Sequence, residues 1–444
     1  MTRAGDPKSA TERYVAAFES FAGNGASGAP GWLKTKRESA ISRFAETGFP
    51  HSRLEAWRFT DVKPIAGEHF VLAAKPEVSA AIRQAADAQL LGGAERHAAV
   101  FLNGHFVPEL SSLEGLPQGV KLGSLRAALE SDAKLVEEHL TRYARDERNP
   151  LTALSTAFIS DGGFAYIPDD VVLERPLQLL FLADPASGSN PMWHPRTLIV
   201  AGRGAGGSLV ESYVALGDGT YWTNAVTEVV LGEHAKIDTY RVQRESVQAY
   251  HTATTESYQA RGSVFKLVNF TFGAELSRQD INAVLDGEGA DCTLDGLSML
   301  EGRQHTDHHT TLEHAQPHCT SWEYFNGVFD DRARGVFTGR IIVRPGAQQT
   351  DSKQTNNNLL LSERARADSQ PQLEIYADDV KCTHGATLGP IDDEHLFYLQ
   401  SRGLSRQEAR HLLTYGFGSE ILEAVKLDRL KEQLDGMVRD RLSG

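Results

Sequence analysis

Residues 262–272 read GSVFKLVNFTF, and residues 289–299 repeat the same pattern as GADCTLDGLSM. Each stretch opens on a glycine and continues into a run of strand-forming residues, with an apolar residue three positions after the glycine. The two glycines are 27 residues apart, and no helical pattern lies between them. A short strand-type repeat with this period is typical of a parallel β-solenoid, in which each repeat forms one turn.

The same corner recurs on both sides of these two stretches. Corner residues stand at Gly206, Gly262, Gly289, Pro317 and Gly346, in steps of 56, 27, 28 and 29, with His234 midway in the double step. The residues three positions after the corners are Leu209, Ile237, Phe265, Cys292, Thr320 and Gln349. We therefore expect Leu209, Ile237 and Phe265 to stack in one inward column, although the apolar character fades at the last two positions.

A second column precedes the first by seven residues: Val230, Tyr258, Leu285 and Ile342, with Leu312 one place out. Together the columns predict a mainly β protein with a right-handed parallel β-helix core over residues 166–390. Regularly spaced short strands also suit a β-sandwich, which is the alternative.

The flanking regions read as helical. Residues 1–165 form a mainly helical N-terminal domain with one hairpin, marked by Asn103-Gly104 between two strand-type runs. Residues 391–444 form a C-terminal helical domain, in which Asp392 and Ser405 are candidate N-caps and Glu408 completes a capping box with Ser405.

An apolar stripe runs along the C-terminal helices: Leu412, Leu413, Ile421, Leu422 and Val425. Such a stripe either docks a helix on its own domain or binds a partner. We assign these five residues as partner-binding candidates, with the first possibility left open.

Composition excludes several classes of protein. The 444 residues carry a formal charge of −14, which argues against nucleic-acid or anionic-membrane binding. Three cysteines are too few for a disulfide framework, and no apolar run is long enough for a membrane helix. The N-terminal residues lack the apolar core of a signal peptide, so a cytoplasmic protein is expected.

Motifs for nucleotide chemistry are absent. A glycine-rich stretch at residues 202–207 follows an apolar run, but the residues after it look like a strand instead of the helix that a dinucleotide fold needs, so a solenoid corner is expected. No phosphate-binding GxxxxGK[ST] motif occurs, and any ATP-driven step must belong to another polypeptide.

Histidines crowd one segment: His305, His308, His309, His314 and His318, with Cys319 directly after them. Imidazole suits several transition metals, which raises a metal hypothesis. The spacings cross strand and corner, however, so stacked polar rungs are the favoured interpretation.

Residues 378–389 read DDVKCTHGATLG and place a cysteine and a histidine close to acidic and basic side chains. On a strand Cys382 and His384 share one face and present a thiol beside an imidazole, a pair that suits iron. An iron–sulfur site needs about four ligands, so one chain offers half a site. A Cys-x-His pair by itself also fits a purely structural role.

This segment, continued by LFYLQSRGL at residues 396–404, closely resembles the C-terminal signature of the SufB/SufD iron–sulfur cluster assembly family. Residues 53–60, RLEAWRFT, look like the N-terminal pattern of the SufD branch of that family. The resemblance spans nearly the whole chain. At the family position of the SufB interface cysteine this chain reads Gln354-Thr355-Asn356-Asn357, which favours SufD over SufB.

The resemblance implies a non-catalytic scaffold subunit, not an enzyme, in a SufBCD complex. Its partners would be a SufB-type paralogue, as a heterodimer, and a SufC-type ABC ATPase that docks on residues 391–444; a homodimer is possible in isolation. His384 and Cys382 would contact iron or a nascent cluster shared with the partner. The cluster would be transient, and no cofactor would be tightly bound.

A β-helix carbohydrate lyase or hydrolase is the alternative function, because its fold would look the same. Such an enzyme needs acidic groups gathered on one face. The best candidates are Asp330-Asp331 and Asp378-Asp379, but adjacent residues of a strand point to opposite faces.

Overall fold

The computed structural model describes residues 7–24, 28–93, 96–187 and 189–442. The N-terminal region contains helices α1 Pro7–Asn24, α2 Gly31–Thr47, α3 Lys63–Gly67, α4 Ala80–Gln89, α5 Leu125–Ser131, α6 Ala133–His139 and α7 Pro150–Ala157. Its strands are β1 Val71–Leu72, β2 His97–Leu102, β3 His105–Phe106, β4 Lys121–Ser124 and β5 Gly163–Ile167.

The strands of the core follow without an intervening α-helix: β6 Leu177–Ala183, β7 Pro191–Trp193, β8 Arg196–Ala201, β9 Gly206–Ala215, β10 Trp222–Leu231, β11 Lys236–Arg244, β12 Tyr250–Gln259, β13 Val264–Thr271, β14 Leu276–Leu285, β15 Asp291–Leu300, β16 His305–His314, β17 Thr320–Phe329, β18 Arg334–Val343, β19 Thr350–Leu360, β20 Arg366–Ile375 and β21 Val380–Gly389. Helices α8 Asp393–Ser401, α9 Arg406–Leu422 and α10 Asp428–Leu442 follow them.

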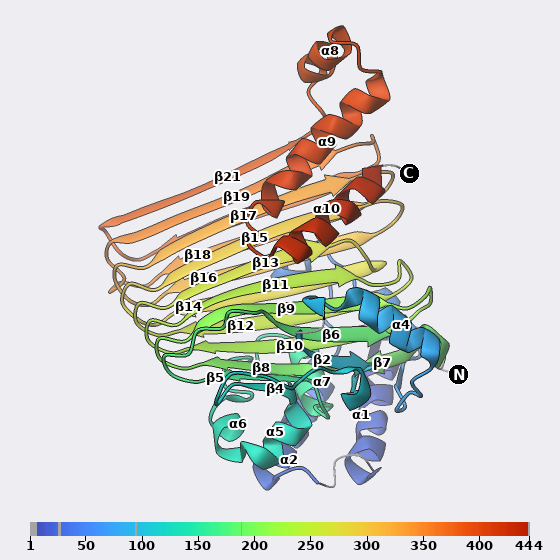
Figure 1. The fold of residues 1–444 in the computed structure, drawn as a ribbon, viewed down its shortest axis with the longest axis vertical. Coiled ribbons are helices and arrows are strands. Elements are labelled where there is room, and N and C mark those ends of the chain that lie inside the picture. Colours follow the sequence, from blue (N-terminus) through green and yellow to red (C-terminus); the bar gives the residue numbers. More distant parts are fainter. Residues whose placement is uncertain (1–6, 25–27, 94–95, 188, 443–444) are drawn as a thin grey trace.

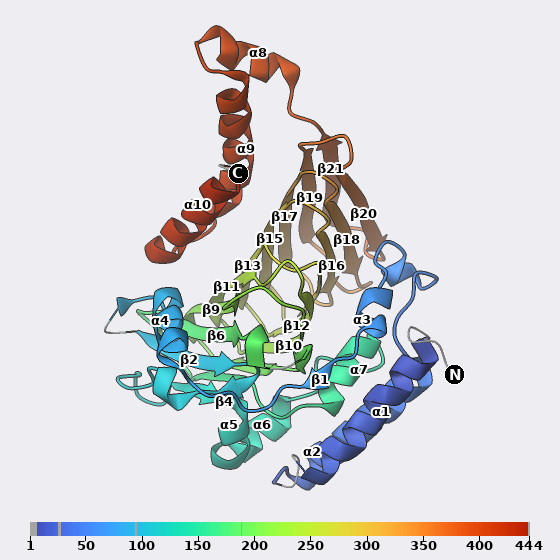
Figure 2. The same ribbon diagram turned by 90° about the vertical axis from the view of Figure 1, so that its right-hand side faces the viewer.

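Two sheets enclose the core, and the chain alternates between them (Figures 1 and 2). Sheet A runs in the order β20-β18-β16-β14-β12-β10-β8-β5-β4, and sheet B in the order β21-β19-β17-β15-β13-β11-β9-β6-β2-β3. From β8 onward each of these strands pairs in parallel with the strand two places along the chain, for example β10 with β12 and β11 with β13. This pairing confirms the parallel β-solenoid and excludes the antiparallel sandwich.

The turn length matches the repeat in the sequence. Trp222 of β10 lies opposite Tyr250 of β12, Tyr250 lies opposite Leu276 of β14, and Leu276 lies opposite His305 of β16. One solenoid turn therefore takes about 28 residues. The glycine-rich stretch at 202–207 spans the corner between β8 and β9, as predicted, and Gly204 there has a φ of 65°.

The predicted inward column is correct for Ile237, Phe265 and Cys292, which lie opposite one another, but it is wrong for Leu209. Leu209 lies opposite Thr239, and Gly207 is the residue that meets Ile237. Leu209 is still inward and buried, one inward position further along its strand.

The same kind of register shift affects the later turns and the second column. Ser321, not Thr320, continues from Cys292, and Gln349 lies in the corner before β19. Val230 and Tyr258 are in register, whereas Val284 occupies the place expected for Leu285.

The corners explain these shifts. The residues with left-handed backbone at equivalent corners are Gly204, His234, Gly262, Gly289, His318 and Gln349, with φ between 57° and 70°. Counting three residues from each of them reaches Gly207, Ile237, Phe265, Cys292, Ser321 and Ser352, which is the observed column. Glycine is the residue that usually marks this conformation, because other residues rarely adopt it. The corners at His318 and Gln349 have no glycine at that position, so the sequence does not mark them.

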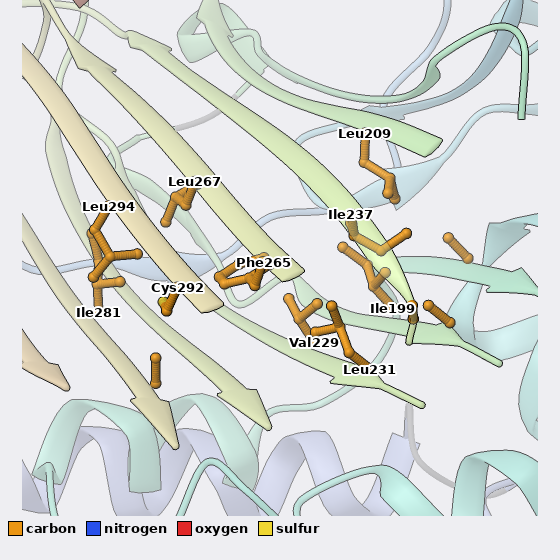
Figure 3. Packing of buried hydrophobic residues seen from close by; sticks show 14 of the residues in the cluster. Ile199, Leu209, Val229, Leu231, Ile237, Phe265, Leu267, Ile281, Cys292 and Leu294 are labelled. Carbon is orange, nitrogen blue, oxygen red and sulfur yellow. The ribbon is translucent and has the colours of Figure 1, made fainter. Parts of the chain in front are cut away.

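Apolar side chains from both sheets fill the interior of the solenoid turns between β8 and β15 (Figure 3). Phe265 of β13 lies between Ile237 of β11 and Cys292 of β15, and Val229 and Leu231 face them from β10. All five side chains are buried.

Helices cover the outer faces of both sheets. Helices α1, α2, α3 and α7 pack on sheet A, where Tyr14 and Phe49 meet Trp222 at ring distances of 6.0 and 6.2 Å (Figure 2). Helices α9 and α10 lie on sheet B, where Leu434 and Val438 join a cluster with Tyr240 and Phe270.

The N-terminal region also extends the sheets. The hairpin of β2 and β3 turns at Asn103 and Gly104, with φ of 47° and 80°, and β2 continues sheet B beside β6. The expected division at residues 165 and 166 falls inside β5, which pairs with β8. Within the described part of the chain, no helix is long and apolar enough to cross a membrane.

Candidate functional site

Cys382 and His384 lie on β21, the last strand of the solenoid. Their partners on β19 are Ser352 and Gln354, both buried inward-facing residues. The register therefore turns Cys382 and His384 toward the solenoid interior, on one face of the strand. The Ile237, Phe265 and Cys292 column continues through Ser321 and Ser352 to Cys382.

The two side chains differ in exposure because the solenoid ends at this turn. Cys382 is half-buried and packs against the apolar core, whereas His384 is exposed. Burial first, and then the charge of Asp351, raise the pKa of the Cys382 thiol. The thiol is therefore protonated in the isolated chain at neutral pH, and a metal that binds it must displace the proton.

A buried polar pair lies beneath His384. His384 is opposite Gln354, and Gln354 is opposite Glu323 of β17 and donates a hydrogen bond from Nε2 to its Oε2. Burial raises the pKa of Glu323 to about 7, and Oε1 of Glu323 has no hydrogen-bond partner among the described residues. Neither residue was predicted; counting strand register back from His384 is the signal that finds them.

The Glu323 carboxyl makes a pH-dependent contribution to stability. Its pKa in the folded state, about 7, exceeds its ordinary value of 4.5, so the stabilisation is complete below pH 4.5 and is lost as pH rises through 7. Compared with the wild type, Glu323→Gln should gain free energy of unfolding over this pH window, up to about 3 kcal/mol. Urea unfolding of both proteins between pH 4.5 and 8 checks this, and a constant difference would contradict it.

The pair on β21 does not complete a metal site on its own. Among the residues that the structure describes, no group of three or more His, Cys, Asp and Glu side chains is arranged to hold a metal ion. Two ligands fall short of the four or so that an iron–sulfur cluster takes. A cluster held at this pair would therefore need further ligands beyond those that the described residues offer.

The end of the solenoid is open. Strand β20 is at the edge of sheet A and β21 at the edge of sheet B, and no other strand among the described residues pairs with their outer edges. In Figure 1 helix α8 projects beyond this end. Unpaired strand edges readily accept strands of another chain. Cys382 and His384 therefore stand where a second chain can add to both sheets.

The histidine segment forms β16 and its following corner, and its members point in different directions. His305 contacts the Thr60 hydroxyl at 2.9 Å, His308 contacts the Asn269 amide at 2.8 Å, and His314 contacts Ser321 at 2.8 Å. Burial lowers the pKa of each of these three imidazoles to about 4. Their neutral rings serve as polar rungs inside and against the solenoid.

The N-terminal signature at residues 53–60 docks on sheet A through a buried arginine. The Arg278 guanidinium lies 3.8 Å from the Trp57 ring centroid and donates to the Ala56 carbonyl at 2.8 Å. It also pairs with Asp280 at 2.6 Å and contacts Asp307 at 2.5 Å. The stacking of Arg278 on Trp57 explains the tryptophan of the signature, because a cation stacks well on an indole face.

The threonine of the signature is bound by the same network. The Thr60 hydroxyl donates to Asp307 at 2.6 Å. Burial raises the pKa of Asp307, but the Arg278 charge leads the opposing interactions, which together leave the pKa below its usual value. The signature is thus a latch between the N-terminal region and strands β14 and β16.

The five partner-binding candidates separate into two sets. Ile421, Leu422 and Val425 are buried against sheet B, so the chain itself covers them. Leu412 is 50% exposed and Leu413 is half-buried. The remaining exposed apolar surface nearby is on α8, where Phe397 is 73% and Tyr398 56% exposed.

The acidic residues considered for a lyase lie in turns. Asp330 and Asp331 connect β17 to β18, and Asp330 pairs with Arg410 at 3.3 Å. Asp378 and Asp379 precede β21 and are exposed. Neither pair lies within a strand face of the solenoid.

Comparison with known proteins agrees with the fold and the signatures. Residues 184–417 match the model described as SUF system FeS cluster assembly, SufBD core domain, and residues 8–179 match the SufBD protein N-terminal region. A SufBD family iron–sulfur cluster assembly protein of Synechocystis sp. is 34% identical over 412 residues, covering 90% of this chain and 89% of the relative.

Two SufD proteins are similar over nearly the same extent. The iron–sulfur cluster assembly protein SufD of Escherichia coli is 31% identical over 411 residues, covering 91% of this chain and 92% of the relative. SufD of Bacillus subtilis is 26% identical over 426 residues, covering 93% and 94%. With a β-solenoid core, both signatures and matches along almost its whole length, the chain belongs to the SufB/SufD family of iron–sulfur cluster assembly proteins.

Proposed function

We propose that this chain is the SufD-type, non-catalytic scaffold subunit of a SufBCD complex. It pairs with a SufB-type paralogue through the open edges of β20 and β21, and a transient iron–sulfur cluster forms at that junction. The observation that carries the proposal is the placement of Cys382 and His384 at the open end of the solenoid, on the face that a partner would cover. A cytoplasmic setting fits the three unpaired cysteines.

His384 is the principal ligand from this subunit in the proposal. Its imidazole is exposed, whereas the Cys382 thiol is half-buried and has a raised pKa. Thr355, at the family position of the SufB cysteine, has no thiol, so the thiolates come mainly from the partner. An iron–sulfur cluster takes about four ligands, and the partner supplies those that Cys382 and His384 do not.

His384→Ala should reduce cluster formation several-fold without weakening assembly of the complex, because the exposed ring contributes little to folding. Cys382→Ala should have a milder effect. The matched control is Thr383→Ala, since Thr383 is exposed on the opposite face of the same strand. The measurement is cluster absorbance of complexes purified anaerobically. Wild-type cluster content in His384→Ala would refute the role of His384, and equal loss in both variants would make Cys382 an equal ligand.

We further propose that the C-terminal helices, residues 391–444, bind a SufC-type ATPase. The docking surface consists of Phe397 and Tyr398 on α8 and Leu412 on α9, all at least half exposed. Large apolar side chains at such exposure suit an interface in which a few residues supply most of the binding energy. Ile421, Leu422 and Val425 fix the C-terminal end of α9 on sheet B.

Phe397→Asp should weaken ATPase binding by roughly 2 kcal/mol or more, because it removes an apolar anchor and buries a charge. A point substitution is preferable to deletion of residues 405–444, which would expose the apolar cluster between α9, α10 and sheet B. Val247→Asp is the control, since Val247 is a 48% exposed residue in a solenoid turn. Co-purification with the ATPase is the readout, and undiminished binding by Phe397→Asp would rule out this surface.

A further inference from the structure

A groove runs along the outer face of sheet A beneath the loop of residues 140–149, which joins α6 to α7. Two hollows, of about 870 and 420 Å³, form it and share the lining residues Arg145, Arg148, Glu256, Glu313 and Arg344. Volumes of this size are typical of small-molecule sites. Neither the proposed cluster site nor the docking helices contribute to this groove.

The smaller hollow is rich in positive charge, although the whole chain carries −14. Among the described residues, five arginines line it: Arg145, Arg148, Arg278, Arg340 and Arg344. Arg278 is committed to Asp280 and Asp307, and Arg340 of β18 to Glu374 at 2.6 Å. The other three belong to the loop above or to the turn after β18. The guanidinium groups therefore approach the hollow from two sides.

The carboxylates of the hollow offset this charge only in part. Arg344 pairs with Glu313 at 2.7 Å, while the nearest approach of Arg148 to Glu256 is 3.6 Å. Burial raises the pKa of Glu256 to about 8, so at neutral pH its carboxyl is mostly protonated and can donate a hydrogen bond. The charge of Arg148 thus stays largely uncompensated.

The loop is held in place from both ends. The buried Glu228 carboxylate accepts backbone N–H groups of Thr141 at 2.8 Å, Tyr143 at 2.9 Å and Ala144 at 3.0 Å, and pairs with Arg196 at 2.7 Å. At the other end, the Asn149 side chain donates to Asp280 at 3.1 Å and caps α7.

This support leaves the arginines of the loop exposed at a regular spacing. Arg142, Arg145 and Arg148 recur every third residue and are exposed, whereas Ala144 between them is buried. A preorganised loop lowers the entropy cost of binding, because the ligand need not order it. The arginines of the loop are therefore held in place, and the excess of arginines over carboxylates in the smaller hollow favours an anion there.

We propose that this groove binds a phosphate-bearing small molecule, whose phosphate lies between Arg145 and Arg148 of the loop and Arg344 in the turn after β18. A tetrahedral phosphate offers oxygens in several directions and can accept from both walls at once, whereas the two oxygens of one carboxylate lie in a single plane. Guanidinium groups form strong paired hydrogen bonds with such an anion. The proposal goes beyond the scaffold function and does not depend on it.

Inorganic pyrophosphate is the probe, titrated calorimetrically into the purified full-length chain. Binding with a Kd below about 1 mM is expected, and Arg148→Ala and Arg145→Ala should each weaken it about tenfold or more. Both side chains are exposed, so the variants should fold, which circular dichroism confirms. Arg303→Ala is the matched control, because Arg303 is an exposed arginine that lines a separate hollow of about 520 Å³.

A second measurement places the ligand. Pyrophosphate should slow hydrogen exchange of the backbone amides in residues 141–149 and leave the corner around Arg303 unchanged. Four results would overturn the proposal: no binding at 10 mM pyrophosphate (about tenfold above the expected limit), equal weakening by Arg303→Ala, malonate binding as tightly as pyrophosphate, or unaltered exchange in the loop.

Discussion

Replacing Phe265 by alanine should lower the free energy of unfolding by about 3–5 kcal/mol. The side chain is fully buried between Ile237 and Cys292 in the stacked column, so its removal leaves a cavity bounded by two turns. Repetitive parallel pairing on both sides prevents the backbone from collapsing into that space. Urea unfolding monitored by circular dichroism measures the change.

The control for Phe265 is Trp322→Ala on β17. Trp322 is also a large aromatic residue on a strand of sheet B, but it is 44% exposed and faces outward. Its removal should cost much less. Equal losses in the two variants, or a loss below about 1 kcal/mol for Phe265→Ala, would mean that the column does not carry the packing assigned to it.

Glu228→Ala should be as costly, about 3–5 kcal/mol, for an electrostatic reason. Glu228 and Arg196 are both fully buried, so removing the carboxylate leaves a guanidinium without its counter-charge in the protein interior. Three backbone N–H groups of the loop lose their acceptor at the same time. Calorimetric unfolding measures the loss, and hydrogen exchange should show residues 141–144 losing protection.

The control for Glu228 is Glu233→Ala, since Glu233 is an exposed glutamate in the corner after β10. It should change the stability by no more than about 0.5 kcal/mol. A comparably small change in Glu228→Ala would show that water reaches Arg196 and that the loop does not depend on this carboxylate.

The corners show how far the fold was readable from the sequence. Gly262 and Gly289 are both the visible glycines and the residues with left-handed backbone, so the turns that they begin were predicted in register. At His318 and Gln349 the chain adopts the same conformation without glycine. The prediction placed these corners at the nearby Pro317 and Gly346 instead, so the predicted register of the later turns was off by one or more residues.

The candidate site was predictable in its residues but not in its surroundings. The alternation of a strand suffices to place Cys382 and His384 on one face. Their position at an uncovered end, and Gln354 and Glu323 beneath His384, depend on the register of three successive turns. The apolar pattern also could not show that Ile421 and Leu422 of α9 pack against the solenoid of the same chain, because the same stripe would suit binding to a partner.

The latch between the N-terminal signature and sheet A has a consequence for biosynthesis. Arg278 is 222 residues after Ala56 in the sequence, and Asp307 is 247 residues after Thr60. Paired residues of neighbouring solenoid turns, such as Trp222 and Tyr250, are much closer in the sequence. Because the ribosome delivers the N-terminus first, Trp57 and Thr60 emerge long before the strands that bind them exist. A nascent chain arrested before β14 therefore has every earlier turn of the solenoid but an undocked signature, and the Thr60 contact must wait for β16. The latch can thus be complete only after most of the protein has been translated.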